Sequence, residues 1–201
     1  MQIIALLKTF IYLVASSLFL PVLVILSCLF IWMLVYSGTF FRLWLERRKT
    51  EKGGDDMPER ILSGTYETRL PFSVASVVKK LEGLKSPENE VQVVNLLRDS
   101  EHGMWKSLDR LKMVIRIGPG LGLIGTLIPM GTGLASLGQG DLGQLSQDLV
   151  VAFTTTVVGM ALGLLAYFYF TVQRRWVEQD IKNMTLAAEL LTRKAGDHEI
   201  P

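Results

Sequence analysis

Three long runs of the sequence carry no Asp, Glu, Lys or Arg. The runs lie between Lys8 and Arg42, between Arg116 and Asp141, and between Asp148 and Arg174. A bilayer core about 30 Å thick needs about 20 apolar residues in a helix, and each run is long enough. The first run is too long for a signal peptide, and no small-residue cleavage site follows it. The pattern therefore predicts three transmembrane helices.

The basic residues that flank these runs indicate how the helices are oriented. They occur in RLWLERRKTEK, which starts at Arg42, and at Arg110, Lys112, Arg116, Arg174 and Arg175. The connection between the second and third runs, LGQGDLGQLSQD, contains neither Lys nor Arg. Because cytoplasmic loops are enriched in Lys and Arg, we expect the N-terminus outside and the C-terminus in the cytoplasm.

The expected organisation has six parts. They are the N-terminal segment with the first transmembrane helix (1–41), a cytoplasmic helical region (42–116), the second transmembrane helix (117–140), a short external hairpin (141–148), the third transmembrane helix (149–173), and a cytoplasmic C-terminal helix and tail (174–201). Pro21 is expected to kink the first helix.

Within the cytoplasmic region, Glu51 to Glu59 is expected to form a loop and Phe72–Lys85 a short helix. Ser86-Pro87-Glu88 has the pattern of a helix start, with an N-cap, a proline at the first helical position and an acid on the helix dipole. Apolar residues then recur at helical spacing up to Ile115, and no strong helix breaker precedes Gly118-Pro119. One long helix is therefore expected to run from the cytoplasm into the second membrane span.

Composition narrows the function further. The chain has 201 residues, of which 49% are hydrophobic and 20% charged, and its formal net charge is +2. That charge is too small to indicate nucleic-acid binding, and no basic stripe with interleaved aromatic residues is present. The single cysteine, Cys28, cannot form an intramolecular disulfide, and two histidines argue against a metal site. No metal and no cofactor are expected.

The stretch GLGLIG, Gly120 to Gly125, matches the G-x-G-x-x-G pattern of dinucleotide-binding loops, and Asp141 follows about 20 positions later. A true nucleotide loop follows a β-strand and opens an amphipathic helix. Here a charged amphipathic helix precedes the glycines and membrane-length apolar sequence follows them. We therefore reject the cofactor interpretation.

Small residues in membrane helices have another use, because they allow two helix backbones to come close. The second span carries Gly118-xxx-Gly122-xxx-Thr126 on one face, and the third carries Thr155-xxx-Gly159-xxx-Gly163. These rows predict close helix contact within a subunit or between subunits. The residues assigned to packing or hinge roles are Pro119, Gly122, Gly125, Pro129, Gly159 and Gly163, and the two prolines also free backbone carbonyls.

The threonines of these spans allow two interpretations. Thr126 lies midway in the second span, and Thr154, Thr155 and Thr156 lie in the first half of the third. Their hydroxyls either bond to carbonyls three or four residues back, or line a polar path for water or an ion. The spans themselves contain no titratable carboxylate or imidazole of the kind that proton relays use. If ions cross, a partner's helix must supply the carboxylate.

A motif in the second span resembles a known family. Its residues are Leu108, Leu111, Val114, Gly118-Pro119 and the stretch Leu121-Gly122-Leu123-Ile124-Gly125-Thr126-Leu127. The third span, VVAFTTTVVGMALGLLAYFYF, is similar to E-A-L-x-x-T-x-x-G-L, with Thr156 and Gly159 at the Thr and Gly positions. Both patterns, which together cover Leu108 to Arg175, resemble the MotA/TolQ/ExbB proton-channel family and its three-span ExbB/TolQ branch.

The resemblance implies an all-α integral membrane protein of the cell inner membrane that assembles as a pentamer, surrounded by membrane lipids. The pentamer would enclose a dimer of a single-span ExbD-, TolR- or MotB-like partner whose helix carries the essential Asp. Flow of H⁺ or Na⁺ past that Asp would drive rotation and so power work in the periplasm or envelope. By matched position Thr126 and Thr156 would line the pore, with Thr155 beside them, and Pro119 resembles a functional proline of the MotA branch.

Two positions depart from the family pattern. The usual Glu at the start of the third span is Val151 here, and the Gly of G-T-V-x-G-M is Pro129. Asp148, about one turn before Val151, is either a substitute external carboxylate or a solvated hairpin residue. The missing Glu also keeps open an alternative function, a non-conducting membrane scaffold with the same fold. An enzyme is not expected, because the sequence offers no nucleophile–base pair and no metal-ligand cluster.

Overall fold

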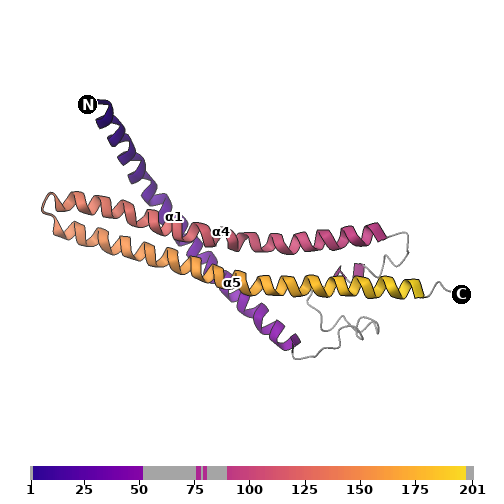
Figure 1. The fold of residues 1–201 in the computed structure, drawn as a ribbon. Helices are drawn as coiled ribbons and strands as arrows, with labels where there is room; N and C mark the ends of the chain where they lie inside the picture. The colour runs from indigo at the N-terminus through magenta and orange to yellow at the C-terminus, as the bar shows by residue number, and fades with distance from the viewer. Residues whose placement is uncertain (1, 52–75, 78, 81–89, 198–201) are drawn as a thin grey trace. The chain divides into compact units, whose positions relative to one another are not determined.

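The computed structural model describes residues 2–51, 76–77, 79–80 and 90–197, and every regular element among them is helical. The long helices are α1 (Gln2–Glu51), α4 (Glu90–Leu137) and α5 (Leu142–Asp197) (Figure 1). Each contains a stretch long and apolar enough to cross a membrane, within Thr9–Arg48, Val91–Leu137 and Leu142–Leu190. The prediction of an all-helical chain with three helices of membrane-spanning length is confirmed.

Part of the predicted region 42–116 is described. The helix expected to run uninterrupted into the second span is α4, which continues through Gly118-Pro119 as well. Of the short helix expected over Phe72–Lys85, residues 76–77 and 79–80 are helical and the others lie outside the described residues. The loop expected after Glu51 and the helix start expected at Ser86-Pro87-Glu88 also lie outside them.

The chain divides into two compact units. The first comprises Met1–Gly38 and Leu111–Tyr169, and the second comprises Thr39–Arg110 and Phe170–Pro201. Each of the three long helices contributes residues to both units.

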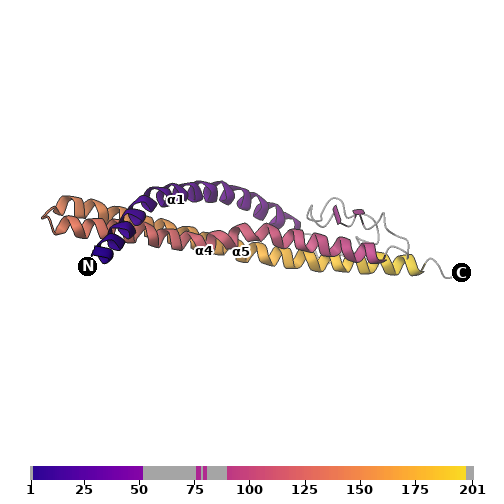
Figure 2. The ribbon, with the colours of Figure 1, turned by 90° about the horizontal axis from the view of Figure 1, so that it is seen from above.

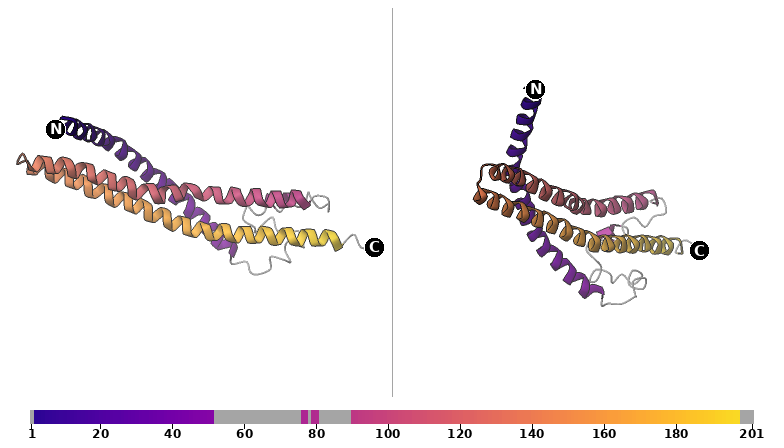
Figure 3. Two further views of the ribbon diagram at one scale, coloured as in Figure 1. Left: turned by 45° about the horizontal axis from the view of Figure 1, so that its top comes forward. Right: turned by 60° about the vertical axis from the view of Figure 1, so that its left-hand side comes forward.

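In the first unit α4 and α5 form an antiparallel hairpin whose helices run side by side (Figures 1 and 3). The buried residues of α5 in this unit follow the spacing of one helix face; they are Ala152, Thr155, Gly159, Leu162, Gly163, Ala166 and Tyr169. Most other large apolar side chains of this hairpin are exposed. Such a surface suits a lipid environment or a neighbouring helix rather than water.

Helix α1 is curved (Figure 2), and Pro21 lies inside it. A proline removes one amide hydrogen bond from a helix and is a recognised cause of bending. In the first unit α1 buries Val22, Leu26 and Met33. The Tyr169 hydroxyl of α5 donates a hydrogen bond of 2.7 Å to Ser37 Oγ, which ties α5 to α1.

The turn between α4 and α5 is shorter than the sequence suggested. Residues 138–141 connect the two helices, so most of the expected hairpin, 141–148, belongs to α5. Gly140 has a positive φ of 82°, Asp141 N–H donates to Ser136 O at 3.0 Å, and Gly140 N–H donates to Leu137 O at 3.0 Å. These are the bonds of a Schellman cap, which favours glycine at the left-handed position.

Asp141 explains why α5 begins so early. Its Oδ1 accepts a hydrogen bond of 2.9 Å from the Gln144 amide. A side-chain oxygen that bonds to the amide three residues later is an N-cap, and it satisfies one of the unpaired donors at a helix start. The polar residues after Asp141, which resemble a loop in the sequence, are therefore the first turns of a helix.

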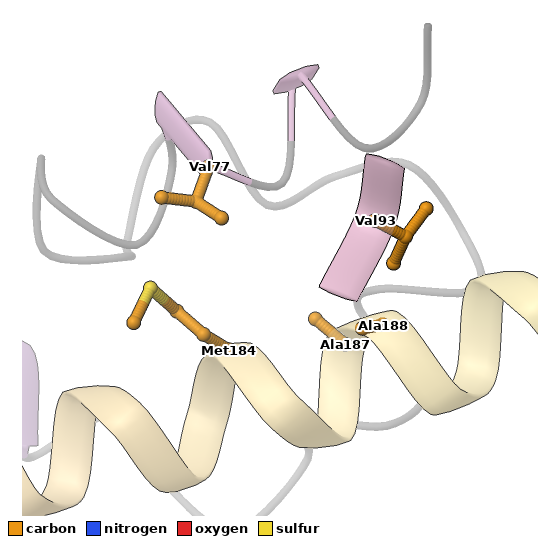
Figure 4. Packing of buried hydrophobic residues seen from close by; sticks show 5 residues of the cluster. All are labelled: Val77, Val93, Met184, Ala187 and Ala188. Atoms are coloured by element: carbon orange, nitrogen blue, oxygen red, sulfur yellow. The ribbon is translucent and has the colours of Figure 1, made fainter. Parts of the chain in front are cut away.

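The second unit has its own small hydrophobic core. Met184, Ala187 and Ala188 of α5 pack with Val93 of α4 and with Val77 (Figure 4). Alanine at two of these α5 positions leaves room for the facing side chains, because its methyl group adds little volume at the contact.

An ion pair also joins α1 to α5 in this unit. Arg47 Nη1 and Nη2 donate to Asp180 Oδ1 at 3.0 Å and Oδ2 at 2.5 Å, and the Asp180 side chain is only 4% exposed. The Arg47 guanidinium lies 5.0 Å from the centre of the Trp176 ring, and Trp176 stacks on Phe40. A bidentate contact of this kind fixes geometry as well as charge.

Removal of this buried carboxylate should destabilise the protein. Asp180→Asn leaves the Arg47 guanidinium without its counter-ion, so we expect a loss of about 3–5 kcal/mol. The measurement is thermal unfolding of the full-length protein in detergent. The control is Glu178→Gln, because the Arg174–Glu178 pair is exposed (57% and 48%) and such pairs contribute about 1 kcal/mol at most. Equal losses in the two variants would contradict a stabilising role for the Arg47–Asp180 pair.

Candidate functional site in the α4–α5 hairpin

The glycines of α4 and α5 contact each other through backbone atoms. A Cβ added to Gly159 would lie 2.7 Å from Gly118 O and 2.7 Å from Gly122 Cα, closer than real Cβ atoms come. A Cβ added to Gly122 would lie 3.1 Å from Gly159 Cα. No side chain separates the helices here, so the contact consists of backbone packing of the type that small residues permit in membranes.

Pro119 belongs to the same contact. A Cβ added to Gly163 would lie 2.7 Å from Pro119 Cγ, so the proline ring lies directly against the glycine of α5. Pro119 has no amide hydrogen for the carbonyl four residues earlier, that of Ile115. This carbonyl oxygen lies 3.7 Å from the same Cβ position on Gly163, so α5 covers it.

The threonines lie next to this contact. A Cβ added to Gly125 would lie 2.9 Å from Thr155 Cβ, and Thr156 O lies 3.5 Å from the Cβ position of Gly122. Thr126 and Thr155 are buried, at 8% and 5% exposure, whereas Thr156 is half-buried and Thr154 is exposed. Hydroxyl-bearing residues of both helices therefore gather at one level of the hairpin.

Three of the four hydroxyls bond to their own helix. Thr126 Oγ1 donates to Leu123 O at 2.7 Å and Thr154 Oγ1 to Val150 O at 2.7 Å, while Thr155 Oγ1 lies 2.9 Å from Ala152 O. These bonds use the hydroxyl proton but leave the oxygen able to accept a hydrogen bond. Each oxygen thus remains a polar atom inside an apolar stretch.

Nearer the turn, Asp148 of α5 is half-buried against α4. Its Oδ2 accepts a hydrogen bond of 2.8 Å from Thr132 Oγ1, and its Oδ1 accepts one of 3.0 Å from Gln144 Nε2. Gly133 lies beside the carboxylate, since a Cβ added there would be 3.3 Å from Asp148 Cβ. Val151, where the family pattern has Glu, is exposed.

Thr132 and Gln144 were not among the residues that sequence reasoning selected. Thr132 and Asp148 lie the same number of residues before and after Gly140, so an antiparallel hairpin that turns at Gly140 brings them face to face. This symmetry is the signal that could have found the pair. The sequence pattern hides this symmetry, because the polar residues up to Asp148 resemble a connection between helices.

Of the selected residues, the structure brings together Pro119, Gly122, Gly125, Thr155, Gly159 and Gly163 in the α4–α5 contact. Thr126 is buried on α4 one turn beyond Gly122. Pro129 is also buried, and its carbonyl lies 3.0 Å from Thr132 Oγ1. Asp148 faces Thr132 and is separate from the glycine contact.

The exposed apolar surface and the three helices of membrane-spanning length define an integral membrane protein, all-helical in its described residues. The model of the MotA/TolQ/ExbB proton channel family matches residues 74–185, more than half of the chain, and the protein belongs to this family. This is a family of membrane channel subunits, not of enzymes. Searches of curated proteins and of solved structures gave no match.

The glycine contact predicts a sharp difference between two glycines. Gly159→Ala places a methyl group against the α4 backbone, and the overpacking should cost about 1–3 kcal/mol. Gly131→Ala is the matched control, because nothing lies within 4 Å of its Cβ position and alanine favours a helix by up to about 1 kcal/mol. Thermal unfolding in detergent should show a loss for the first variant only. An unchanged midpoint for Gly159→Ala would contradict the backbone contact.

Proposed function

We propose that this protein is the proton-conducting subunit of an inner-membrane motor that couples the ion-motive force to work in the periplasm or envelope. The observation that carries the proposal is the family match together with threonines of both helices at one level of a glycine-packed hairpin. Glycine packing holds the backbones rigidly, and the hydroxyl oxygens give an ion polar partners within an apolar stretch.

The proposal requires a partner chain. The sequence has no acidic residue and no histidine between Arg116 and Asp141 or between Asp148 and Arg174. Proton relays in membranes depend on titratable side chains at that depth. We propose that a dimer of a single-span ExbD-, TolR- or MotB-like protein supplies an Asp and that a pentamer of this chain surrounds it.

Exposed apolar side chains on the hairpin support assembly in the membrane. On α5 they include Phe153, Val157, Met160 and Leu164, and on α4 they include Leu123, Leu127 and Leu134. These surfaces are available for lipid, for neighbouring subunits or for the partner helix. Of the three threonines proposed to line the ion path, Thr156 is the most accessible, because it is half-buried whereas Thr126 and Thr155 are buried.

The proposed orientation places the α4–α5 turn outside and both chain regions 42–116 and 174–201 in the cytoplasm. Basic residues flank the spans on the side away from the turn, at Arg42, Arg116 and Arg174, and the turn itself has none. The positive-inside rule then gives an external N-terminus.

A scaffold without conduction is the alternative function. Two observations favour it: Thr126, Thr154 and Thr155 donate to their own helices, and Val151 replaces the family's Glu. A scaffold would need the glycine contact but not the threonine hydroxyls.

The double substitution Thr126→Val and Thr156→Val separates the two functions. It keeps side-chain shape and removes two polar groups worth about 1 kcal/mol each, so partner-dependent ion flux into proteoliposomes should fall at least about 10-fold. The control is Thr185→Val, since Thr185 makes the same type of backbone bond, to Ile181 O, in the second unit. Undiminished flux would show that conduction does not need these two hydroxyls, whereas function retained without any flux would favour the scaffold.

Assembly provides an independent test. Native mass spectrometry of the full-length protein, extracted gently from the membrane, should give five copies of the chain, alone or with two partner chains. The proposal needs a closed ring, because an ion path around a central dimer requires subunits on every side. A stable monomer or dimer without partner-dependent ion flux would rule the channel function out.

A further inference from the structure

We infer that Asp148 is a proton-exchange site near the turn of the α4–α5 hairpin and that Thr132 is its positioning residue. The inference deepens the proposed function and rests on it for the direction of proton flow. It concerns residues on the two sides of the turn that the family pattern does not select.

Both helices build the site. Asp148 and Gln144 come from α5, Thr132 and Pro129 come from α4, and both carboxylate oxygens accept a hydrogen bond. Gly133 provides the space: a Cβ added there would lie 3.3 Å from Asp148 Cβ and 3.7 Å from Oδ2. The carboxylate therefore lies against the α4 backbone and is only partly in contact with solvent.

The Thr132 hydroxyl has two acceptors within reach. Its Oγ1 lies 2.8 Å from Asp148 Oδ2 and 3.0 Å from Pro129 O, but it carries a single proton. When Asp148 is ionised, the hydroxyl donates to the carboxylate, which is the stronger acceptor because it is charged.

Protonation reverses this bond without breaking the site. A proton from the aqueous phase forms an O–H bond at Asp148 Oδ2, and this O–H donates to Thr132 Oγ1. The Thr132 hydroxyl proton then rotates toward Pro129 O. One proton converts the carboxyl group from charged to neutral, and every polar atom of the site keeps a hydrogen-bond partner. Neither state therefore has the free-energy cost of an unsatisfied buried group.

The two side chains that bond to the Asp148 carboxylate, Thr132 and Gln144, carry no charge. Facing it, α4 has no Asp, Glu, His, Lys or Arg between Arg116 and its C-terminal end, and α5 has none between Asp148 and Arg174. Asp141 caps the start of α5 through the Gln144 amide. In α1 the sole charged residue before Arg42 is Lys8. Neither α4 nor α5 carries a Lys, Arg or His between Arg116 and Arg174.

The contacts suit a proton better than a metal ion. Thr132 presents its hydroxyl hydrogen and Gln144 its amide hydrogens to the carboxylate, and these donors would repel a bound cation.

The location of Asp148 suits exchange with water. A helix needs about 20 residues to span the hydrocarbon core, and the charge-free run after Asp148 is already longer than that. Asp148 lies roughly 10 Å along α5 from Thr155. Its role would therefore be to exchange protons on the side of the turn, and not to carry them through the level of the threonines.

Infrared difference spectra test the site in the full-length protein without a partner. Spectra of the protein in a lipid bilayer are recorded at neutral and at acid pH, and the difference between them should contain the carbonyl band of a protonated carboxylic acid. Asp148→Asn should remove this band. Thr132→Val should shift that band, because the acid loses its acceptor, whereas Thr132→Ser should leave it in place. Asp141→Asn is the control that leaves the band unchanged. A spectrum unaffected by Asp148→Asn, or a band unaffected by Thr132→Val, would overturn the inference.

Ion flux separates this inference from the proposed function. With the partner present, Asp148→Asn should lower proton flux about 100-fold, the low end of what positioned proton-transfer groups contribute. Full flux in Asp148→Asn, together with loss of flux in the Thr126/Thr156 double variant, would overturn the inference and leave the channel function standing. If the natural protein does not conduct either, the proposed channel function is wrong. The infrared result alone then decides the role of Asp148.

Discussion

The contact of α4 with α5 depends on the absence of side chains at a few positions. Gly118, Gly122 and Gly159 let two helix backbones touch, and the distances leave no room for one methyl group at Gly159. In a membrane such packing replaces the hydrophobic effect, because lipid tails solvate apolar side chains as well as a neighbouring helix does. Pro119 lies on Gly163 and Thr155 on Gly125 in the same contact, and nearer the turn Asp148 reaches Thr132.

Polar groups in the hairpin are arranged around that contact in two levels. The threonines adjoin the glycines, and the Asp148 carboxylate lies closer to the turn, where Gly133 makes space for it. Two prolines add hydrogen-bond acceptors. Pro119 leaves the Ile115 carbonyl without a helical donor, and the Pro129 carbonyl is a second acceptor for the Thr132 hydroxyl. Apart from Asp148, these hydrogen-bonding atoms all belong to uncharged residues.

Some of these features could be predicted from the sequence and others could not. The charge-free runs predict the three transmembrane helices, because a bilayer imposes a minimum length on an apolar helix. The glycine spacing predicts the rows of small residues on α4 and α5 that face each other. The position of the turn was missed because its determinants are a left-handed Gly140 and an Asp141 cap, whereas the polar residues that follow resemble a loop. That error also hid the pairing of Thr132 with Asp148. The Arg47–Asp180 pair, 133 positions apart, leaves no periodic signal at all.

A contact made of backbone atoms has no rotamers, so it cannot rearrange by repacking side chains. A Cβ at position 159 would lie 2.7 Å from Gly118 O and from Gly122 Cα, so no residue with a side chain can take this place on α5 unless the helices separate. Switching elements in proteins generally have two packed arrangements, and this interface offers one. Within the first unit we therefore expect α4 and α5 to move together rather than to slide past each other.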